Sequence, residues 1–137
     1  MRQVYVDSCI VIYLLEAPPE IREAVRDALR PWEGQPAQVY VSALTRLECR
    51  VRPLRENSLE LLAAYDRFFG SRDLRRCRLT SAVYDLATDL RAEHGIKTPD
   101  ALHLAAALDS GCSEFWTNDL RLPTTLGERI RIRVLPG

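Results

Sequence analysis

Apolar positions along the chain recur with two different periods, one typical of helices and one typical of strands. Residues 20–30 show the helical period, because Ile21, Val25 and Leu29 repeat with charged side chains between them. Short runs of β-favouring residues, such as QVYV at 3–6, separate the helical stretches. The patterns predict strands at 3–7, 38–42, 73–80, 114–117 and 129–135, and helices at 8–16, 20–30, 42–53, 58–69, 81–95 and 97–108.

Polar residues, proline and glycine mark where the predicted helices begin and end. Ser8 has a hydroxyl that suits the cap of the first helix, and Ser42 stands at the start of the third. Pro53 is expected to stop that third helix, because proline lacks the backbone N–H that a helix interior needs. Gly95 suits the left-handed conformation that commonly closes a helix, so it is expected to end the helix before it.

Strands and helices alternate along the chain, and this alternation constrains the fold class. Strands that are separated by helices pair in parallel through right-handed crossovers. We therefore expect an α/β fold, a three-layer sandwich with a mostly parallel central sheet and helices on both faces. Open sheets of this kind bind ligands at the carboxyl ends of their strands, so functional residues are expected at that edge.

Length and composition are typical of one soluble globular domain. The 137 residues fit a single domain spanning 1–137, and 47% of them are hydrophobic and 28% charged. No stretch approaches the roughly 18 continuous apolar residues that cross a membrane, and the apolar run near the N-terminus is too short for a signal peptide. We expect a cytoplasmic protein with no membrane contact.

The four cysteines are widely spaced along the sequence, and no two of them form a CxxC pair. This spacing indicates neither a zinc ribbon nor a redox motif. Reduced and mostly buried thiols are therefore expected.

The basic residues offer local, rather than overall, attraction to nucleic acid. The formal net charge is zero, and of the 19 basic residues only Lys97 is a lysine. Arginine suits phosphate contacts because its guanidinium is flat and multidentate, although most surface arginines are solvated or paired with acids. Both interpretations are open for two groups of arginines: Arg46, Arg50, Arg52 and Arg55, and Arg72, Arg75, Arg76 and Arg78.

Four acidic residues occur where the predicted fold gathers them at one edge of the sheet. Asp7 directly follows the first strand, and Asp119 follows the strand at 114–117. Asp100 opens the helix that leads into that strand, and Glu48 lies near the second turn of the helix after the second strand. Converging carboxylates raise one another's pKa unless cations occupy the site. We call these four residues the acidic quartet, and their oxygen-only ligation points to Mg²⁺ or Mn²⁺ rather than zinc.

Each member of the quartet also has a plainer interpretation. Asp100 suits the first turn of a helix, where the macrodipole favours negative charge, so it would then be only a capping charge. Asp7 and Asp119 occupy positions typical of turns, and Glu48 resembles any solvated acid on an amphipathic helix. His103, three residues after Asp100, is expected to be packed or hydrogen-bonded rather than a metal ligand.

Four sequence blocks follow one another in a familiar order and spacing: VDSCIVIYLL, SALTRLECR, KTPDALHLAAAL and WTNDLRL. They resemble the blocks of the PIN-domain nucleases, and within these the VapC-type toxins of bacterial toxin–antitoxin pairs. The resemblance covers essentially the whole chain. By motif, the acidic quartet matches the family's acids, Ser8 its small hydroxyl residue and Thr117 its threonine before the last acid. Where some relatives have a further acid, this chain has Leu120 and Arg121.

The resemblance implies a Mg²⁺- or Mn²⁺-dependent endoribonuclease that is neutralised by an antitoxin. The acidic quartet would then be catalytic, with Asp7, Asp100 and Asp119 as the principal metal ligands. Glu48 would bind metal or position the attacking water as a base. Ser8 and Thr117 would hold ligands or a bridging water by hydrogen bonds, and the RNA backbone would be contacted by Arg46, Arg50 and Arg121.

A homodimer is also expected, because relatives are often dimeric and because the helices at 20–30 and 58–69 show wide apolar faces. Two other functional classes remain open. One is a non-catalytic PIN-like module that binds RNA or protein, and the other is a nuclease that acts on DNA. Four facing carboxylates argue against the first, and the small size of the chain argues against the second.

Overall fold

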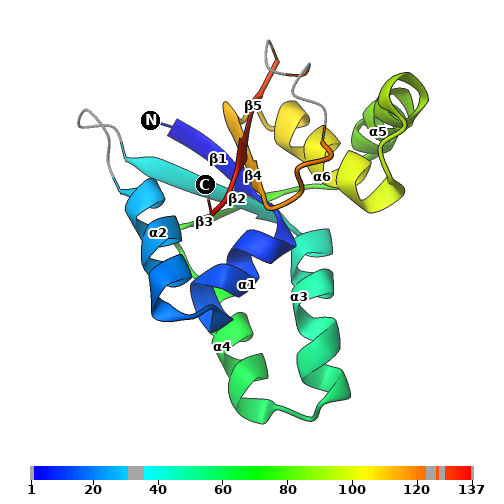
Figure 1. The fold of residues 1–137 in the computed structure, drawn as a ribbon. Coiled ribbons are helices and arrows are strands. Elements are labelled where there is room, and N and C mark those ends of the chain that lie inside the picture. Colours follow the sequence, from blue (N-terminus) through cyan, green and yellow to red (C-terminus); the bar gives the residue numbers. More distant parts are fainter. Residues whose placement is uncertain (1, 31–35, 123–125, 127–128, 137) are drawn as a thin grey trace.

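A five-stranded sheet with helices on both faces forms the protein (Figure 1). The computed structural model describes residues 2–30, 36–122, 126 and 129–136. The elements are, in chain order, β1 (Arg2–Val6), α1 (Ser8–Glu16), α2 (Pro19–Leu29), β2 (Ala37–Ser42), α3 (Ala43–Arg55), α4 (Leu59–Phe69), β3 (Leu74–Cys77), α5 (Ser81–His94), α6 (Thr98–Asp109), β4 (Glu114–Thr117) and β5 (Arg131–Val134). The α/β sandwich predicted from the alternation of strands and helices is confirmed.

The sheet has the strand order β3-β2-β1-β4-β5, and every pair of neighbouring strands in it is parallel. Tyr5 of β1 is in register with Tyr40 of β2 and with Phe115 of β4. From β1 the chain builds outward through β2 and β3 on one side, and it later returns to add β4 and β5 on the other. In open sheets ligands bind where the strand order reverses, so this order directs attention to the carboxyl ends of β1 and β4.

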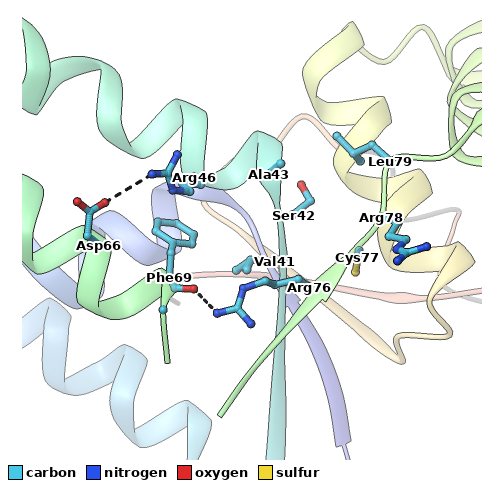
Figure 2. A pocket seen from close by; sticks show the side chains of 11 residues that line it. Val41, Ser42, Ala43, Arg46, Asp66, Phe69, Arg76, Cys77, Arg78 and Leu79 are labelled. Atoms are coloured by element: carbon cyan, nitrogen blue, oxygen red, sulfur yellow. Dashed lines mark hydrogen bonds and ion pairs between the residues drawn. The ribbon is translucent and has the colours of Figure 1, made fainter. Parts of the chain in front are cut away.

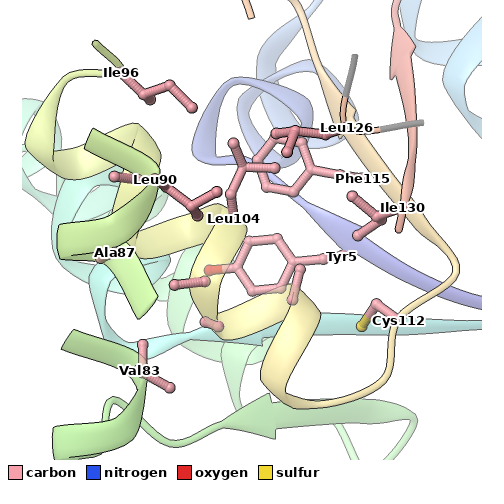
Figure 3. Packing of buried hydrophobic residues seen from close by; sticks show 14 of the residues in the cluster. Tyr5, Val83, Ala87, Leu90, Ile96, Leu104, Cys112, Phe115, Leu126 and Ile130 are labelled. Atoms are coloured by element: carbon pink, nitrogen blue, oxygen red, sulfur yellow. The ribbon is translucent and has the colours of Figure 1, made fainter. Parts of the chain in front are cut away.

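The central strand β1 supplies side chains to both layers of helices. Val4 and Val6 are fully buried in a cluster with residues of α1, α2 and α4. Tyr5 points to the opposite face, where it packs with Leu104 and Phe115 under α5 and α6 (Figure 3). Full burial of such side chains stabilises the fold by about 1.5–3 kcal/mol each. The alternation along one strand thus fixes the two helical layers around the sheet.

Helix α3 is longer than its sequence predicts. The backbone N–H of Ser42 donates to Oγ1 of Thr45 at 3.1 Å, which fixes the start of the helix as expected. Pro53 lies inside the helix, which continues to Arg55, so the prediction that this proline stops the helix is wrong. Proline removes a single backbone donor, and the buried ring of Pro53 keeps its place in the helix. Gly95 ends α5 with a φ of 66°, as predicted.

The hairpin of α3 and α4 extends away from the sheet in Figure 1. Three large apolar side chains of α3 are exposed, namely Leu47, Val51 and Leu54. Helices α2 and α4, by contrast, bury Val25 and Tyr65 against the sheet. Among the described residues, none of the helices is long and apolar enough to cross a membrane.

All four cysteines are free thiols, as the sequence predicts. Cys49, Cys77 and Cys112 are buried, and Cys9 is half-buried. Burial raises the pKa of the Cys9 thiol to about 12, so this thiol is protonated at neutral pH.

Candidate functional site

Asp7 occupies the turn between β1 and α1, and its carboxylate is fixed by the backbone. Its N–H donates to the carbonyl of Trp116 in β4 at 2.9 Å. Its Oδ1 accepts a hydrogen bond of 2.7 Å from the N–H of Ser8 and a longer one, 3.4 Å, from the Ser8 hydroxyl. Asp7 therefore caps α1, and the prediction that Ser8 is the cap is wrong, because the preceding carboxylate satisfies the first free N–H. The side chain is held facing the sheet edge with only 8% of the residue exposed.

Thr117, the last residue of β4, links two of the acids. Its hydroxyl donates to Oδ2 of Asp7 at 3.0 Å and accepts a hydrogen bond of 3.1 Å from the N–H of Asp119. Thr117 is completely buried, so these contacts are made away from solvent. Asp7 and Asp119 are thereby tied to one hydroxyl at the adjacent ends of β1 and β4.

Glu48 reaches the same edge from α3 and meets a histidine there. Its Oε1 lies 2.5 Å from Nε2 of His103, and that nitrogen lies 3.6 Å from Oδ1 of Asp7. One possible ligand atom from each of these three residues falls within 4.8 Å of the others. His103 is packed and hydrogen-bonded, as expected, but its Nε2 also lies beside the carboxylates of Glu48 and Asp7. The sequence signal for this was its position one turn after Asp100, on a helix that otherwise buries alanine and leucine.

Asp100 lies in the first turn of α6, where burial and the neighbouring acids both act on its carboxyl. Burial raises the pKa of its carboxyl above the usual range, and the charges of Asp7 and Asp119, with a smaller one from Glu48, raise it further. His103 acts in the opposite direction and lowers the pKa of Asp100. Asp100 therefore interacts with every other member of the acidic quartet. Asp100 and Asp119 also line one small pocket of about 160 Å³.

Asp119 is paired with an arginine two residues later. Its Oδ1 accepts hydrogen bonds from the backbone N–H of Arg121 at 2.9 Å and from Nε at 3.0 Å, and its Oδ2 accepts from Nη2 at 3.1 Å. The Arg121 guanidinium holds the pKa of the Asp119 carboxyl below its usual range. The Arg121 side chain is 74% exposed, so it can leave the carboxylate at little cost.

The two other arginines predicted to contact RNA share an acidic partner away from the quartet. Arg50 Nε lies 3.1 Å and Arg46 Nη2 lies 3.8 Å from Oδ1 of Asp66 in α4. Arg46 and Asp66 border an open pocket of about 670 Å³ that also includes Arg76 and Phe69 (Figure 2). No member of the acidic quartet lines this pocket. The sequence could not show that these arginines are paired, because Asp66 belongs to the next helix.

The donor atoms of the site suit a hard divalent cation. Carboxylate oxygens dominate the cluster, as Mg²⁺ and Mn²⁺ prefer. Burial raises the pKa of Asp100, and the charges of Asp7 and Asp119 raise it further; a bound cation would offset that repulsion between carboxylates. Asp7 and Glu48, whose ligand atoms the structure brings together with one of His103, could hold such an ion. Asp100 and Asp119, which line one small pocket, are the other candidates.

Comparisons with known proteins identify the family and the fold. The family model described as the PIN domain matches residues 4–125. Among curated proteins, none matches the sequence. Solved structures with the same fold include a toxin–antitoxin complex from Klebsiella pneumoniae, with 24% identity, a TM-score of 0.64 and coverage of 85% of this chain and 86% of that chain.

Two further structures share the fold at lower identity. VapBC2 from Rickettsia felis, bound to a DNA fragment from its promoter, has 14% identity and a TM-score of 0.71, with coverage of 96% of this chain and 98% of that chain. VapC20 from Mycobacterium tuberculosis, a toxin that cleaves the sarcin–ricin loop, has 17% identity and a TM-score of 0.65. That likeness covers 82% of this chain and 86% of that chain. At these identities the likeness establishes the fold.

Proposed function

Because the chain belongs to the PIN domain family, we propose that it is a metal-dependent endoribonuclease and the toxin of a toxin–antitoxin pair. The observation that carries this proposal is the gathering of acidic groups at one sheet edge: one ligand atom each of Asp7, Glu48 and His103 lies within 4.8 Å of the others, and the Thr117 hydroxyl joins Asp7 to the backbone of Asp119. Asp119 shares a small pocket with Asp100. Isolated capping or turn residues would have no such neighbours. The structural likeness to a toxin that cleaves the sarcin–ricin loop supports RNA as the substrate class.

In the proposed mechanism the acidic quartet is catalytic and holds one or more Mg²⁺ or Mn²⁺ ions. Such an ion, when bound, supplies charge neutralisation at the phosphate and lowers the pKa of a water molecule. Asp7, Asp100 and Asp119 are the principal ligands, directly or through water. Glu48 either completes the ligand set or accepts the proton of the attacking water.

The residues around the quartet would keep its geometry and receive the substrate. Ser8 and Thr117 hold the two oxygens of Asp7 by hydrogen bonds, which fixes the direction of its lone pairs. Arg121 is placed to release Asp119 and contact a phosphate of the RNA backbone. Arg46 and Arg50 are proposed to contact the backbone farther from the cut, and both would have to share their charge with Asp66.

A protein partner is proposed as well. The likeness to toxin–antitoxin complexes supports a cognate antitoxin that binds this chain and blocks the site. We also propose a cytoplasmic homodimer. The exposed apolar residues Leu47, Val51 and Leu54 on α3 support association with another chain, because a monomer would leave them in water. Light scattering at micromolar concentration tests the dimer, and a monomeric mass would contradict it.

A cleavage assay tests the proposed function. The protein is incubated with total cellular RNA and with single-stranded DNA of similar length, each in EDTA and in millimolar Mn²⁺. We expect RNA to be cut in Mn²⁺ and not in EDTA, while the DNA stays intact. Equal cutting of DNA would identify a DNA-directed nuclease instead. Binding of RNA without cutting in Mn²⁺ would identify a non-catalytic module.

A further inference from the structure

Behind the acidic quartet lies a buried chain of polar side chains that the proposed mechanism does not use. His103 of α6 is 1% exposed, and its ring lies between Glu48 on one side and Tyr5 on the other. Nδ1 of the ring lies 2.7 Å from the Tyr5 hydroxyl. That hydroxyl lies 2.9 Å from Oγ of Ser42 and 3.2 Å from Oγ1 of Thr45.

His103, Tyr5, Ser42 and Thr45 come from four different elements and are all buried. Tyr5 and Thr45 are fully buried and Ser42 is 2% exposed. Burying so many polar groups destabilises a fold unless each one has a partner. Here the neighbours of His103 along α6, Ala101 and Leu104, are apolar and fully buried. An aliphatic side chain at position 103 would therefore fill this space without requiring hydrogen bonds to buried polar side chains.

The buried polar side chains allow the His103 imidazole only one orientation. The Tyr5 ring is itself held by stacking on Phe115, with the ring centres 5.5 Å apart and the planes at 8° (Figure 3). The Tyr5 hydroxyl then fixes Nδ1, so Nε2 must face the carboxylates. Of these, Oε1 of Glu48 is the nearest at 2.5 Å, and at that separation a proton has to lie between the two atoms.

We propose that His103 is a positioning residue that fixes the Glu48 carboxylate, and this inference rests on the proposed function of the quartet. The Glu48 side chain stands on α3 with 30% of it exposed, and it has rotamers that lead into solvent. The hydrogen bond between His103 and Glu48 holds Oε1 at the sheet edge, 2.5 Å from Nε2. Tyr5 and, through it, Ser42 and Thr45 hold the histidine in that direction.

The same atoms allow one competing arrangement, in which Nε2 is a metal ligand. A ligand nitrogen must offer its lone pair to the ion, whereas a nitrogen that donates a hydrogen bond to Glu48 has no lone pair available. Pulsed electron paramagnetic resonance on the Mn²⁺-loaded protein separates the two arrangements. A nitrogen coupling that disappears in a His103 variant would overturn the positioning role.

Two amide substitutions supply a matched pair for the main test. The amide nitrogen of His103→Gln reaches the place of Nε2 and can still donate to Glu48. The shorter amide of His103→Asn reaches only the place of Nδ1, so it keeps the contact with Tyr5 and loses the one with Glu48. A role limited to packing would give both variants similar losses, and melting curves in EDTA report that packing separately.

Mn²⁺ affinity by calorimetry and kcat for RNA cleavage are the readouts. We expect His103→Asn to lose about 10- to 100-fold in kcat, in Mn²⁺ affinity or in both, with KM little changed, and His103→Gln to keep both within about threefold. Tyr5→Phe should lower the same quantities less than His103→Asn does. Equal losses in the two amide variants, or no loss in either, would overturn the inference.

The failure of the proposed function would look different. If the wild-type protein binds Mn²⁺ but cuts no RNA, the endoribonuclease proposal fails. The comparison of Mn²⁺ affinities between His103→Gln and His103→Asn still decides whether the histidine positions Glu48.

Discussion

The Thr117 hydroxyl donates a hydrogen bond of 3.0 Å to Oδ2 of Asp7, although 110 positions separate the two residues in the sequence. The contact exists because β1 and β4 are parallel neighbours and both residues lie at the carboxyl ends of these strands. The same hydroxyl accepts the N–H of Asp119. One buried side chain thus sets the spacing of two proposed metal ligands.

Thr117→Val should weaken metal binding more than it weakens the fold. Valine keeps the shape of threonine but cannot donate to Asp7, so we expect Mn²⁺ affinity to fall about tenfold or more. The free energy of unfolding in EDTA should fall by only about 1 kcal/mol. Calorimetric titration with Mn²⁺ measures the first quantity. Thr88→Val is the control, because the Thr88 hydroxyl donates only to the carbonyl of Tyr84 on exposed α5. Equal affinities in the two variants would remove Thr117 from the site.

Asp100→Asn should stabilise the metal-free protein at neutral pH. The folded-state pKa of Asp100 is raised by burial and by the charges of Asp7 and Asp119, so its ionised form opposes folding. This penalty is present above the folded-state pKa and disappears as the pH falls through it. A capping charge would behave oppositely, and its removal would cost a few tenths to about 1 kcal/mol. Thermal melting in EDTA measures whether the substitution raises or lowers stability. A variant less stable than wild type would indicate that Asp100 is only a helix-capping charge.

In Mn²⁺ the wild-type protein should become more stable than Asp100→Asn. An ion that binds only the folded state, at about a hundredfold above its Kd, adds roughly 2.7 kcal/mol, which for a chain of this length raises Tm by about 8 °C. Wild type should show this rise in melting curves, and Asp100→Asn should lose most of it. A wild-type curve that does not respond to Mn²⁺ would speak against a metal site.

Arg121→Gln should increase Mn²⁺ affinity while weakening RNA binding. The guanidinium occupies both oxygens of Asp119 and keeps the pKa of that carboxyl low, so it competes with a cation for the same atoms. Exposed ion pairs contribute at most about 1 kcal/mol, so the gain in Mn²⁺ affinity should not exceed about fivefold. Arg30→Gln removes an exposed arginine paired with Asp27 and serves as the control. A fall in Mn²⁺ affinity in Arg121→Gln would show that Arg121 supports the site instead of competing for it.

The pair of Arg2 and Glu114 should make stability depend on acid pH. Burial alone would raise the pKa of the Glu114 carboxyl, but hydrogen bonds from Arg2 and from the Trp116 indole outweigh it, and the pKa ends below the usual range. Ionised Glu114 therefore stabilises the folded state at pH values above its unfolded-state pKa near 4.3. This stabilisation is lost as the pH falls through the folded-state pKa. Arg2→Ala should lose about 3 kcal/mol at neutral pH. Denaturant unfolding from pH 7 to 3 should give a flatter profile for the variant, and parallel profiles would contradict this.

The strand pattern was enough to predict that Asp7 and Asp119 lie together, but not to predict the other contacts of the candidate site. Asp7 and Asp119 could be placed together because each follows an apolar strand, and parallel strands end at a common edge. The partners of Glu48 could not be predicted, since His103 is 55 positions away and only the packing of α3 against α6 brings them together. In the same way, Asp66 pairs with Arg46 and Arg50 only because α3 and α4 pack against each other.

Two helix boundaries could not be predicted from the residues at those positions alone, because contacts with other residues decided them. Ser8 has a good capping side chain, yet Asp7 precedes it and accepts its N–H. Pro53 is a strong stop signal, but tertiary burial kept α3 helical past it. Helix propensity is a property of a single residue type, whereas the cap of α1 and the length of α3 depend on contacts with other residues.

The most direct test of the central claim is the rate of Mn²⁺-dependent RNA cleavage by Asp100→Asn compared with Asp85→Asn. Both changes remove one carboxylate and keep its shape, but Asp85 lies on the exposed face of α5. We predict that Asp100→Asn loses at least about a hundredfold in kcat, while Asp85→Asn cuts at the wild-type rate and both variants stay folded by circular dichroism. Near-normal cleavage by Asp100→Asn in Mn²⁺ would contradict the account and remove Asp100 from the site.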